Sequence, residues 1–113
     1  MRSLFHPNPQ ERKEPIMFAR LTIVQVKAGA MDEVLKIYGD HVVPSAKGQK
    51  GYKGILMLTD RKTGKGISIT LWESEQDAVA NEKTGYYQQQ VGRFKDYFAK
   101  PPVQEGYEVS IQA

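Results

Sequence analysis

The chain of 113 residues is long enough for one domain with one hydrophobic core, and its composition is ordinary for a globular protein. Its net charge of +3 is too small and too dispersed for the clustered basic surface that nucleic-acid binding requires. With no cysteine and only two histidines, disulfides, thiol nucleophiles and multi-histidine metal sites are excluded. No apolar run is long enough to cross a membrane and no secretory signal is visible, so we expect a cytoplasmic protein.

Residues 1–15 predict a disordered N-terminal tail, because they contain three prolines and mostly polar side chains. We therefore expect the folded domain to occupy residues 16–113. Its first element is a strand over residues 17–27, where β-branched residues alternate with others.

The first predicted helix begins near Met31 and carries a single apolar stripe. It should kink or end at Val43, because Pro44 disfavours helical geometry in the residue before it. Two further strands are predicted over residues 52–59 and 66–73.

The segment between those two strands predicts a hairpin, because Asp60 suits the start of a turn and Gly64 can adopt a positive φ. Ser74 then predicts the N-cap of a second helix, with Asp77 three residues later in the position of a capping box. The helical pattern weakens at Thr84 and resumes after Gly85.

The resumed helix carries an apolar stripe formed by Tyr87, Val91, Phe94 and Phe98. Consecutive prolines then end it, and residues 106–113 alternate as a final strand. The order is β-α-β-β-α-β, which predicts an α+β, ferredoxin-like fold: a four-stranded antiparallel sheet with both helices on one face.

Side chains alternate between the two faces of a strand, which divides each predicted strand into two sets. We expect the more apolar set to face the helices: Leu21, Ile23, Ile67, Ile69 and Leu71. The other set would lie on the uncovered face: Arg20, Thr22, Val24, Val26, Ser68, Thr70 and Trp72. A surface of that mixed character is typical of a partner or ligand surface, so we expect a second copy of the chain to cover it and enclose a cavity.

Three stretches together resemble the antibiotic-biosynthesis monooxygenase-type dimeric α/β barrels. They are the opening "MFARLTIVQVKAGAMDEVLKIY", the strand "ITLWES" that leads into a capped helix, and the broken helix "KTGYYQQQVGRF". The resemblance covers residues 17–113 and implies a homodimer whose two sheets pair into a barrel. It also implies a range of functions, among them cofactor-free oxygenases of quinols and aromatic polyketides, and haem-degrading enzymes.

The haem-degrading branch implies an asparagine on the first strand, a tryptophan on the third and a histidine in the second helix. Trp72 matches the tryptophan, Thr22 lies near the asparagine position, and Val91 lies about where the histidine would be. Because the second helix has no histidine, the resemblance favours an oxygenase that uses no cofactor and no metal over haem degradation.

The candidate catalytic residues are Arg20, His41 and Tyr86. Arg20 could stabilise a developing phenolate or enolate, or form an ion pair at the rim of a dimer. His41 could act as a general base, since histidine titrates near neutral pH, or cap a helix end in solvent. Tyr86 could present its hydroxyl to a pocket beside the helix break, whereas Tyr87 and Tyr38 continue apolar stripes and are expected in the core.

The candidate substrate-binding residues are Trp72, Thr22, Ser68 and Thr70. Trp72 could stack on a planar substrate or anchor a partner subunit, and the three hydroxyls could orient a ligand or only line a wet cavity. Two hypotheses follow. The chain is a cofactor-free oxygenase of a small electron-rich aromatic or quinol substrate, or a non-catalytic dimeric barrel that binds a small hydrophobic or aromatic molecule.

Overall fold

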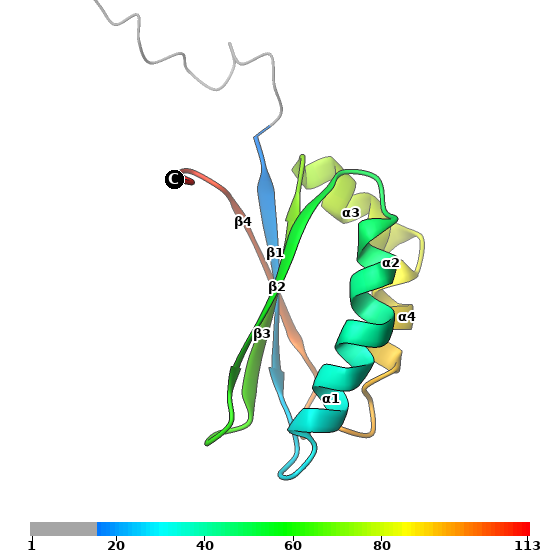
Figure 1. Cartoon of the computed structure of the whole chain (residues 1–113). Helices are drawn as coiled ribbons and strands as arrows, with labels where there is room; N and C mark the ends of the chain where they lie inside the picture. The colour runs from blue at the N-terminus through cyan, green and yellow to red at the C-terminus, as the bar shows by residue number, and fades with distance from the viewer. Residues whose placement is uncertain (1–15) are drawn as a thin grey trace, which may run out of the picture.

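The computed structural model describes residues 16–113, so the tail predicted over residues 1–15 lies outside the described part of the chain. The described residues form a four-stranded sheet with helices along one side (Figure 1). In chain order the elements are β1 (Phe18–Gln25), α1 (Met31–Ile37), the π-helical turn η2 (Tyr38–Val42), α2 (Val43–Lys47), β2 (Tyr52–Asp60), β3 (Lys65–Trp72), α3 (Glu75–Lys83), α4 (Tyr86–Gly92) and β4 (Val103–Glu108).

The strands lie in the order β2-β3-β1-β4, and each neighbouring pair is antiparallel. This is the α+β, ferredoxin-like arrangement that the order of elements predicts, and the prediction is confirmed. Because β1 lies between β3 and β4, its side chains occupy the middle of both sheet faces.

The first helical segment does not end at Val43. It continues from α1 through η2 into α2, and the predicted irregularity takes the form of a widened turn ahead of Pro44. In that turn the Val43 N–H donates to the carbonyl of Tyr38, five residues earlier. Proline has no N–H of its own, so a local change of hydrogen-bond register is a common way to accommodate it. The widened turn begins at Tyr38, whose side chain is buried against the sheet.

The predicted hairpin and helix cap are both confirmed. Gly64 has a φ of 81° and donates its N–H to the Asp60 carbonyl at 2.8 Å. Ser74 is the N-cap of α3, and its hydroxyl oxygen accepts the Asp77 N–H at 3.2 Å. In place of a full capping box, the Ser74 hydroxyl also donates to the Asp77 carboxylate at 3.1 Å.

The last two elements differ from the prediction in their bounds. The helix ends at Gly92 rather than running to Phe98, because the following segment joins the end of β1: the Ala99 N–H donates to the Gln25 carbonyl at 2.7 Å. The final strand covers Val103–Glu108 rather than residues 106–113, because Glu108 pairs with the first residue of its partner strand β1.

The predicted assignment of the two sheet faces is wrong. Trp72 is 5 % exposed and packs with Phe18 and Ala78 on the side covered by the helices. Val24 and Val26 are likewise buried in the core beneath the helices. The set that contains Trp72 therefore faces the helices, and the more apolar set lies on the uncovered side. The prediction failed because it assumed that the helix-covered side must carry the more apolar set of side chains.

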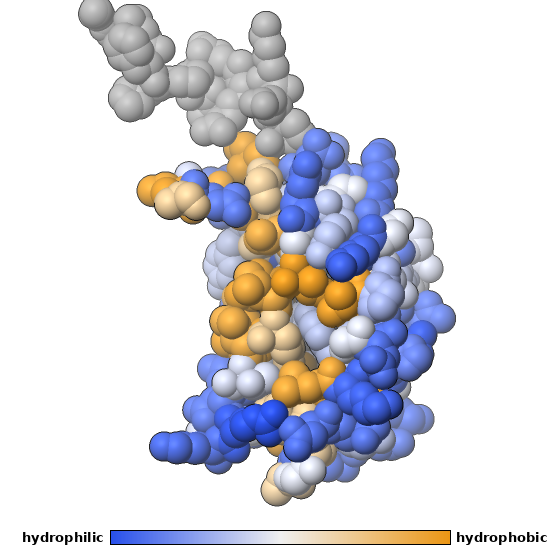
Figure 2. Space-filling model, viewed as in Figure 1, coloured by the Kyte–Doolittle hydropathy of each residue, from blue (hydrophilic) through white to orange (hydrophobic). Residues whose placement is uncertain are grey.

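We call the uncovered side the free sheet face. The strand register places on it an almost continuous layer of apolar side chains: Ala19, Leu21 and Ile23 of β1, Leu56 and Leu58 of β2, Ile67, Ile69 and Leu71 of β3, and Val103 and Tyr107 of β4. Leu56 is 52 % exposed and Tyr107 53 % exposed. In Figure 2 hydrophobic residues gather along the sheet on the side turned away from the helices.

The face assignment can be tested by fluorescence, since Trp72 is the only tryptophan. We expect blue-shifted emission and weak quenching by acrylamide, because the indole is enclosed by its own chain. We expect both properties to persist in Leu58→Glu, which alters only the free sheet face. Red-shifted, readily quenched emission in that variant, with its circular dichroism spectrum unchanged, would contradict the assignment.

Candidate active site

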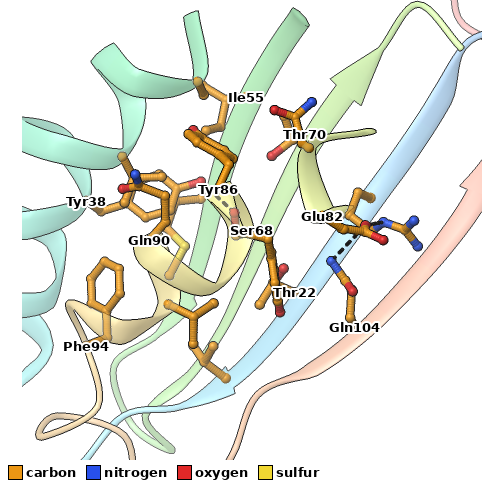
Figure 3. Close-up of a pocket in the computed structure, with 18 of the residues that line it drawn as sticks. Thr22, Tyr38, Ile55, Ser68, Thr70, Glu82, Tyr86, Gln90, Phe94 and Gln104 are labelled. Carbon is orange, nitrogen blue, oxygen red and sulfur yellow. Dashed lines mark hydrogen bonds and ion pairs between the residues drawn. The ribbon is translucent and has the colours of Figure 1, made fainter. Parts of the chain in front are cut away.

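A cavity of about 100 Å³ lies between the sheet and the helices, on the side of Trp72 (Figure 3). Every strand and every helical segment contributes side chains to its wall. Engineered cavities of about 150 Å³ bind benzene, so the partly open space here is on the scale of one small ring. Its apolar lining includes Val24, Ile55, Met57 and Phe94.

A row of polar side chains crosses the floor of this cavity. Ser68 of β3 and Gln104 of β4 both pair in register with Thr22 of β1, so the three lie at one level of the sheet. Each meets a polar group from the helices: Ser68 bonds Tyr38, Thr22 lies against Tyr87, and Gln104 bonds Glu82. The row explains why polar residues share a sheet face with a tryptophan, since they line a cavity rather than meet bulk water.

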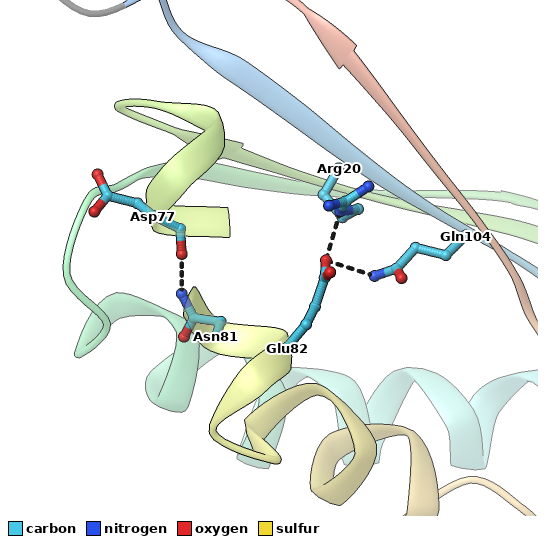
Figure 4. A network of polar contacts seen from close by, with 5 residues as sticks. All are labelled: Arg20, Asp77, Asn81, Glu82 and Gln104. Atoms are coloured by element: carbon cyan, nitrogen blue, oxygen red, sulfur yellow. Dashed lines mark hydrogen bonds and ion pairs between the residues drawn. The ribbon is translucent and has the colours of Figure 1, made fainter. Parts of the chain in front are cut away.

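The charged part of the cavity is an ion pair between Arg20 and Glu82 (Figure 4). Arg20 Nε lies 2.7 Å from Glu82 Oε2, and the two side chains are 18 % and 25 % exposed. The Nε–H is not aligned for a hydrogen bond, so charge rather than a directed bond holds the contact. Gln104 Nε2 donates to the same carboxylate oxygen at 3.2 Å.

Two neighbours fix the position of the Arg20 side chain. Its guanidinium carbon lies 5.2 Å from the centre of the Phe18 ring, within the range of a cation–π contact. It also crosses Gly106, its partner on β4, where an added Cβ would lie 2.5 Å from Arg20 Nη1. Any larger residue at Gly106 would therefore displace the guanidinium or the Phe18 ring.

Three tyrosine hydroxyls also reach the cavity. Burial raises the pKa of Tyr38, a hydrogen bond with Ser68 opposes the shift, and neighbouring Tyr86 adds to it. Burial also raises the pKa of Tyr86. For Tyr87, burial again raises the pKa, while a hydrogen bond with Thr22 lowers it. All three hydroxyls are therefore protonated at neutral pH and are available as hydrogen-bond donors rather than as bases.

Six of the seven predicted site residues line this one cavity: Arg20, Thr22, Ser68, Thr70, Trp72 and Tyr86. His41 is the exception, because it lies exposed on η2 and is not part of the lining. The cavity that they line is formed within a single chain, between its sheet and its helices, whereas they were expected to line a cavity between two copies. Arg20 forms an ion pair with Glu82 of its own chain. Tyr38 belongs to the buried core, as expected, and also lines the cavity, as does Tyr87.

The sequence interpretation missed the polar residues contributed by α3, α4 and β4. Glu82 lies one turn after Ala78, which is buried against Trp72, so both face the sheet. That spacing of four could have identified Glu82. Asn81 and Gln90 are also buried along the cavity wall. Gln104 depends on the register between β1 and β4, for which the sequence contains no signal.

Within residues 16–113 no three His, Cys, Asp or Glu side chains converge as metal ligands. None of the helices in that part of the chain is long and apolar enough to cross a membrane.

The family model for antibiotic biosynthesis monooxygenases matches residues 17–93. The match covers more than half of the sequence, so the chain belongs to the antibiotic biosynthesis monooxygenase family. The family resemblance inferred from the sequence is thereby confirmed.

Two uncharacterised proteins, from two strains of Mycobacterium tuberculosis, are each 30% identical to this chain over 76 residues, or 66% of it. The chain spans about a third, 34%, of the length of these curated relatives.

Solved structures with the same fold include a monooxygenase from the ActVA-Orf6 gene of Streptomyces coelicolor, in complex with nanaomycin D. It has a TM-score of 0.73 and 12% identity, covering 87% of this chain and 91% of that one. SnoaB, a cofactor-independent oxygenase from Streptomyces nogalater, has a TM-score of 0.70 and 10% identity, covering 85% of this chain and 95% of that one. At such low identities the similarity establishes the fold.

The raised tyrosine pKa values can be tested by ultraviolet titration of phenolate. In the folded protein we expect buried tyrosines such as Tyr86 to ionise at a higher pH than their ordinary value of 10.0, and Tyr86→Phe should remove one of these late steps. The unfolded chain releases these phenolic protons at a lower pH than the folded protein. The contribution of the protonated tyrosines to the free energy of unfolding should therefore be complete below about pH 10 and decline above it. The control is the urea-denatured protein, and identical titrations of folded and denatured protein would contradict the assignment.

Proposed function

We propose that this protein is a cofactor-free oxygenase of a small hydroxylated aromatic substrate, with a single-ring quinol as the model. The observation that carries the proposal is the Arg20–Glu82 pair at the edge of an otherwise largely apolar cavity. Family membership supports it, as does the shared fold with structures described as a monooxygenase and a cofactor-independent oxygenase.

The proposed reaction consumes one quinol and one O₂ and yields one hydroxyquinone and one water. One oxygen atom enters the ring, the other leaves as water, and the substrate supplies all four electrons. The protein's part is to remove a proton from a phenolic hydroxyl, which makes the ring a better electron donor, and to keep bulk water away.

Glu82 is proposed as the proton acceptor, in place of His41. It is the only carboxylate among the described residues that line the cavity, whereas His41 lies outside it. Both contacts recorded for the Glu82 carboxylate in residues 16–113 fall on Oε2, which leaves Oε1 to accept a proton. Arg20 would stabilise the resulting phenolate, since it is the only cationic side chain among the described residues of the lining.

Trp72 and Thr70 lie on the same side of the sheet as Arg20. Trp72 packs tightly with Phe18 and Ala78, so we propose that it closes the cavity and offers part of an aromatic wall to the ligand. Thr22, Ser68 and Thr70 are proposed to orient the ligand from the floor. We do not propose haem degradation, because the described lining contains no histidine that could bind the haem iron.

A non-catalytic binding protein is the second candidate. The observation that favours it is that Glu82 is already paired with Arg20, so its charge is neutralised before any ligand arrives. The same cavity would then hold a small aromatic molecule without activating it.

Oxygen uptake with hydroquinone, a naphthohydroquinone and a hydroxyanthrone separates the two candidates. We expect single-ring quinols to be oxidised fastest because of the cavity size, and Glu82→Gln to lower the rate by about 100-fold or more, as loss of a general base does. Asp40→Asn is the matched control, since Asp40 forms an exposed ion pair with Lys36 away from the cavity. Uptake no faster than autoxidation, alongside saturable binding of the quinols, would favour the binding protein.

We also propose that two chains associate through the free sheet face. Its layer of aliphatic side chains on four strands is too large and too apolar to remain in water, and a second copy offers an identical surface. This dimer would bury the apolar layer but would not enclose the cavity, which lies on the other side of the sheet.

Light scattering tests this association. We expect the mass of two chains for the wild type and of one chain for Leu58→Glu, because a carboxylate at Leu58 would be buried without a partner. Gln88→Glu on the exposed side of α4 is the matched control and should remain dimeric. A monomeric wild type at micromolar concentration would contradict the proposal.

A further inference from the structure

One hydroxyl in the cavity wall lacks a hydrogen bond. The Tyr86 oxygen is shielded from solvent and has no partner within residues 16–113. Tyr86 is the first residue of α4 and follows Gly85, whose φ of 85° turns the chain between α3 and α4. A buried hydroxyl without a partner destabilises the folded chain, so a ligand oxygen at this point would recover part of that loss.

A second donor lies beside it. The Tyr38 hydroxyl and Ser68 Oγ are 2.6 Å apart, and either oxygen can be the donor. Each group carries one hydrogen and the contact uses one of the two, so the pair retains one hydrogen for a further acceptor. The widened turn η2 begins at Tyr38 and fixes where its ring reaches the sheet.

The two donors face the same space. Figure 3 shows Tyr86 directed toward Tyr38 and Ser68, and a charge on Tyr86 would be felt at Tyr38. Ser68 lies on β3, whereas Gln104, which donates to Glu82, lies on β4, with β1 and Arg20 between them. Two strand spacings correspond to about 10 Å.

We propose that Tyr86 and the Tyr38–Ser68 pair form a two-donor site for a neutral acceptor oxygen, a carbonyl or phenolic oxygen, on an aromatic ligand. No cationic side chain of the described lining lies at this end, since Arg20 is paired with Glu82. A carboxylate would therefore lose its hydration without gaining a counter-charge, and a hydrocarbon would leave Tyr86 unsatisfied.

The role of the two-donor site in catalysis rests on the proposed function, because both concern the same substrate in the same cavity. When Glu82 takes a proton from one hydroxyl of a quinol and the ring is then oxidised, the second oxygen becomes a quinone carbonyl. Two preorganised O–H donors at that oxygen favour the carbonyl by hydrogen bonding to it as it forms. Tyr86 is thus a residue that selects and orients the substrate at the end opposite the proton acceptor.

Three ligands of nearly equal shape test the site by binding alone: acetophenone, α-methylstyrene and benzoate. We expect wild-type protein to bind acetophenone about tenfold more tightly than α-methylstyrene, as one to two hydrogen bonds allow, and benzoate most weakly. Tyr86→Phe should bring acetophenone to within about twofold of α-methylstyrene and leave the hydrocarbon's affinity unchanged. It should fold normally, with an unchanged or higher Tm, because the hydroxyl it loses is unpaired.

Two further variants complete the test. Tyr97→Phe is the matched control and should keep the wild-type preference, because Tyr97 is outside the cavity lining. Glu82→Gln should also keep it, because the two donors do not involve that carboxylate. Absence of oxygen uptake by the wild type, with its acetophenone preference intact, would refute the oxygenase while leaving the two-donor site in place. An unchanged acetophenone preference in Tyr86→Phe, tightest binding of benzoate, or no saturable binding of any of the three ligands to wild type would overturn the inference.

Discussion

The alternation of side chains along the strands is the constraint on which the rest of this structure depends. It places Thr22, Ser68 and Trp72 on the helix-covered side of the sheet, and Leu21 and Ile69, their neighbours in sequence or register, on the other. Both sides must be removed from water, but they are covered in different ways. The covered side holds a cavity several of whose polar groups find partners on the helices, whereas the free sheet face is mostly apolar and carries Glu105 of β4 beside Leu21.

Three polar pairs join the floor of the cavity to its roof, each with one member from the sheet and one from the helices. Ser68 with Tyr38, Thr22 with Tyr87, and Gln104 with Glu82 tie three different helical segments to three different strands. Such contacts make the positions of the sheet and the helices depend on each other, because moving the helices away from the sheet would leave buried donors unsatisfied. Tyr86 is outside this pairing, and the two-donor proposal rests on that difference.

The separation of roles between the two sheet faces also has a functional consequence. If two copies join through the free sheet face, each retains its own cavity, with its own ion pair and tyrosines. Association would then stabilise the sheet without adding residues to the ligand site. The architecture thus allows loss of dimerisation and loss of ligand binding to be separated by single substitutions on opposite faces.

Much of the fold could be predicted from the sequence, because local signals were sufficient. Gly64, Ser74 and the alternating strands determine the hairpin, the helix cap and the order of elements. The choice of face could not be predicted by apolar content, since a cavity lining mixes polar and apolar groups much as a partly wet surface does. Glu82 and Gln104 were missed because their place in the site depends on how α3 and β4 pack against β1.

The central claim, that the ligand site lies inside one chain between sheet and helices, is most directly tested by diffraction from crystals soaked in 4-bromophenol. The anomalous signal of bromine locates the ring without reference to any assumed function. The account predicts a bromine peak within the cavity, beside the apolar wall formed by Val24 and Phe94, with the hydroxyl toward the polar row. A peak between two sheets, against Leu21 and Ile69 of the free sheet face, would contradict it.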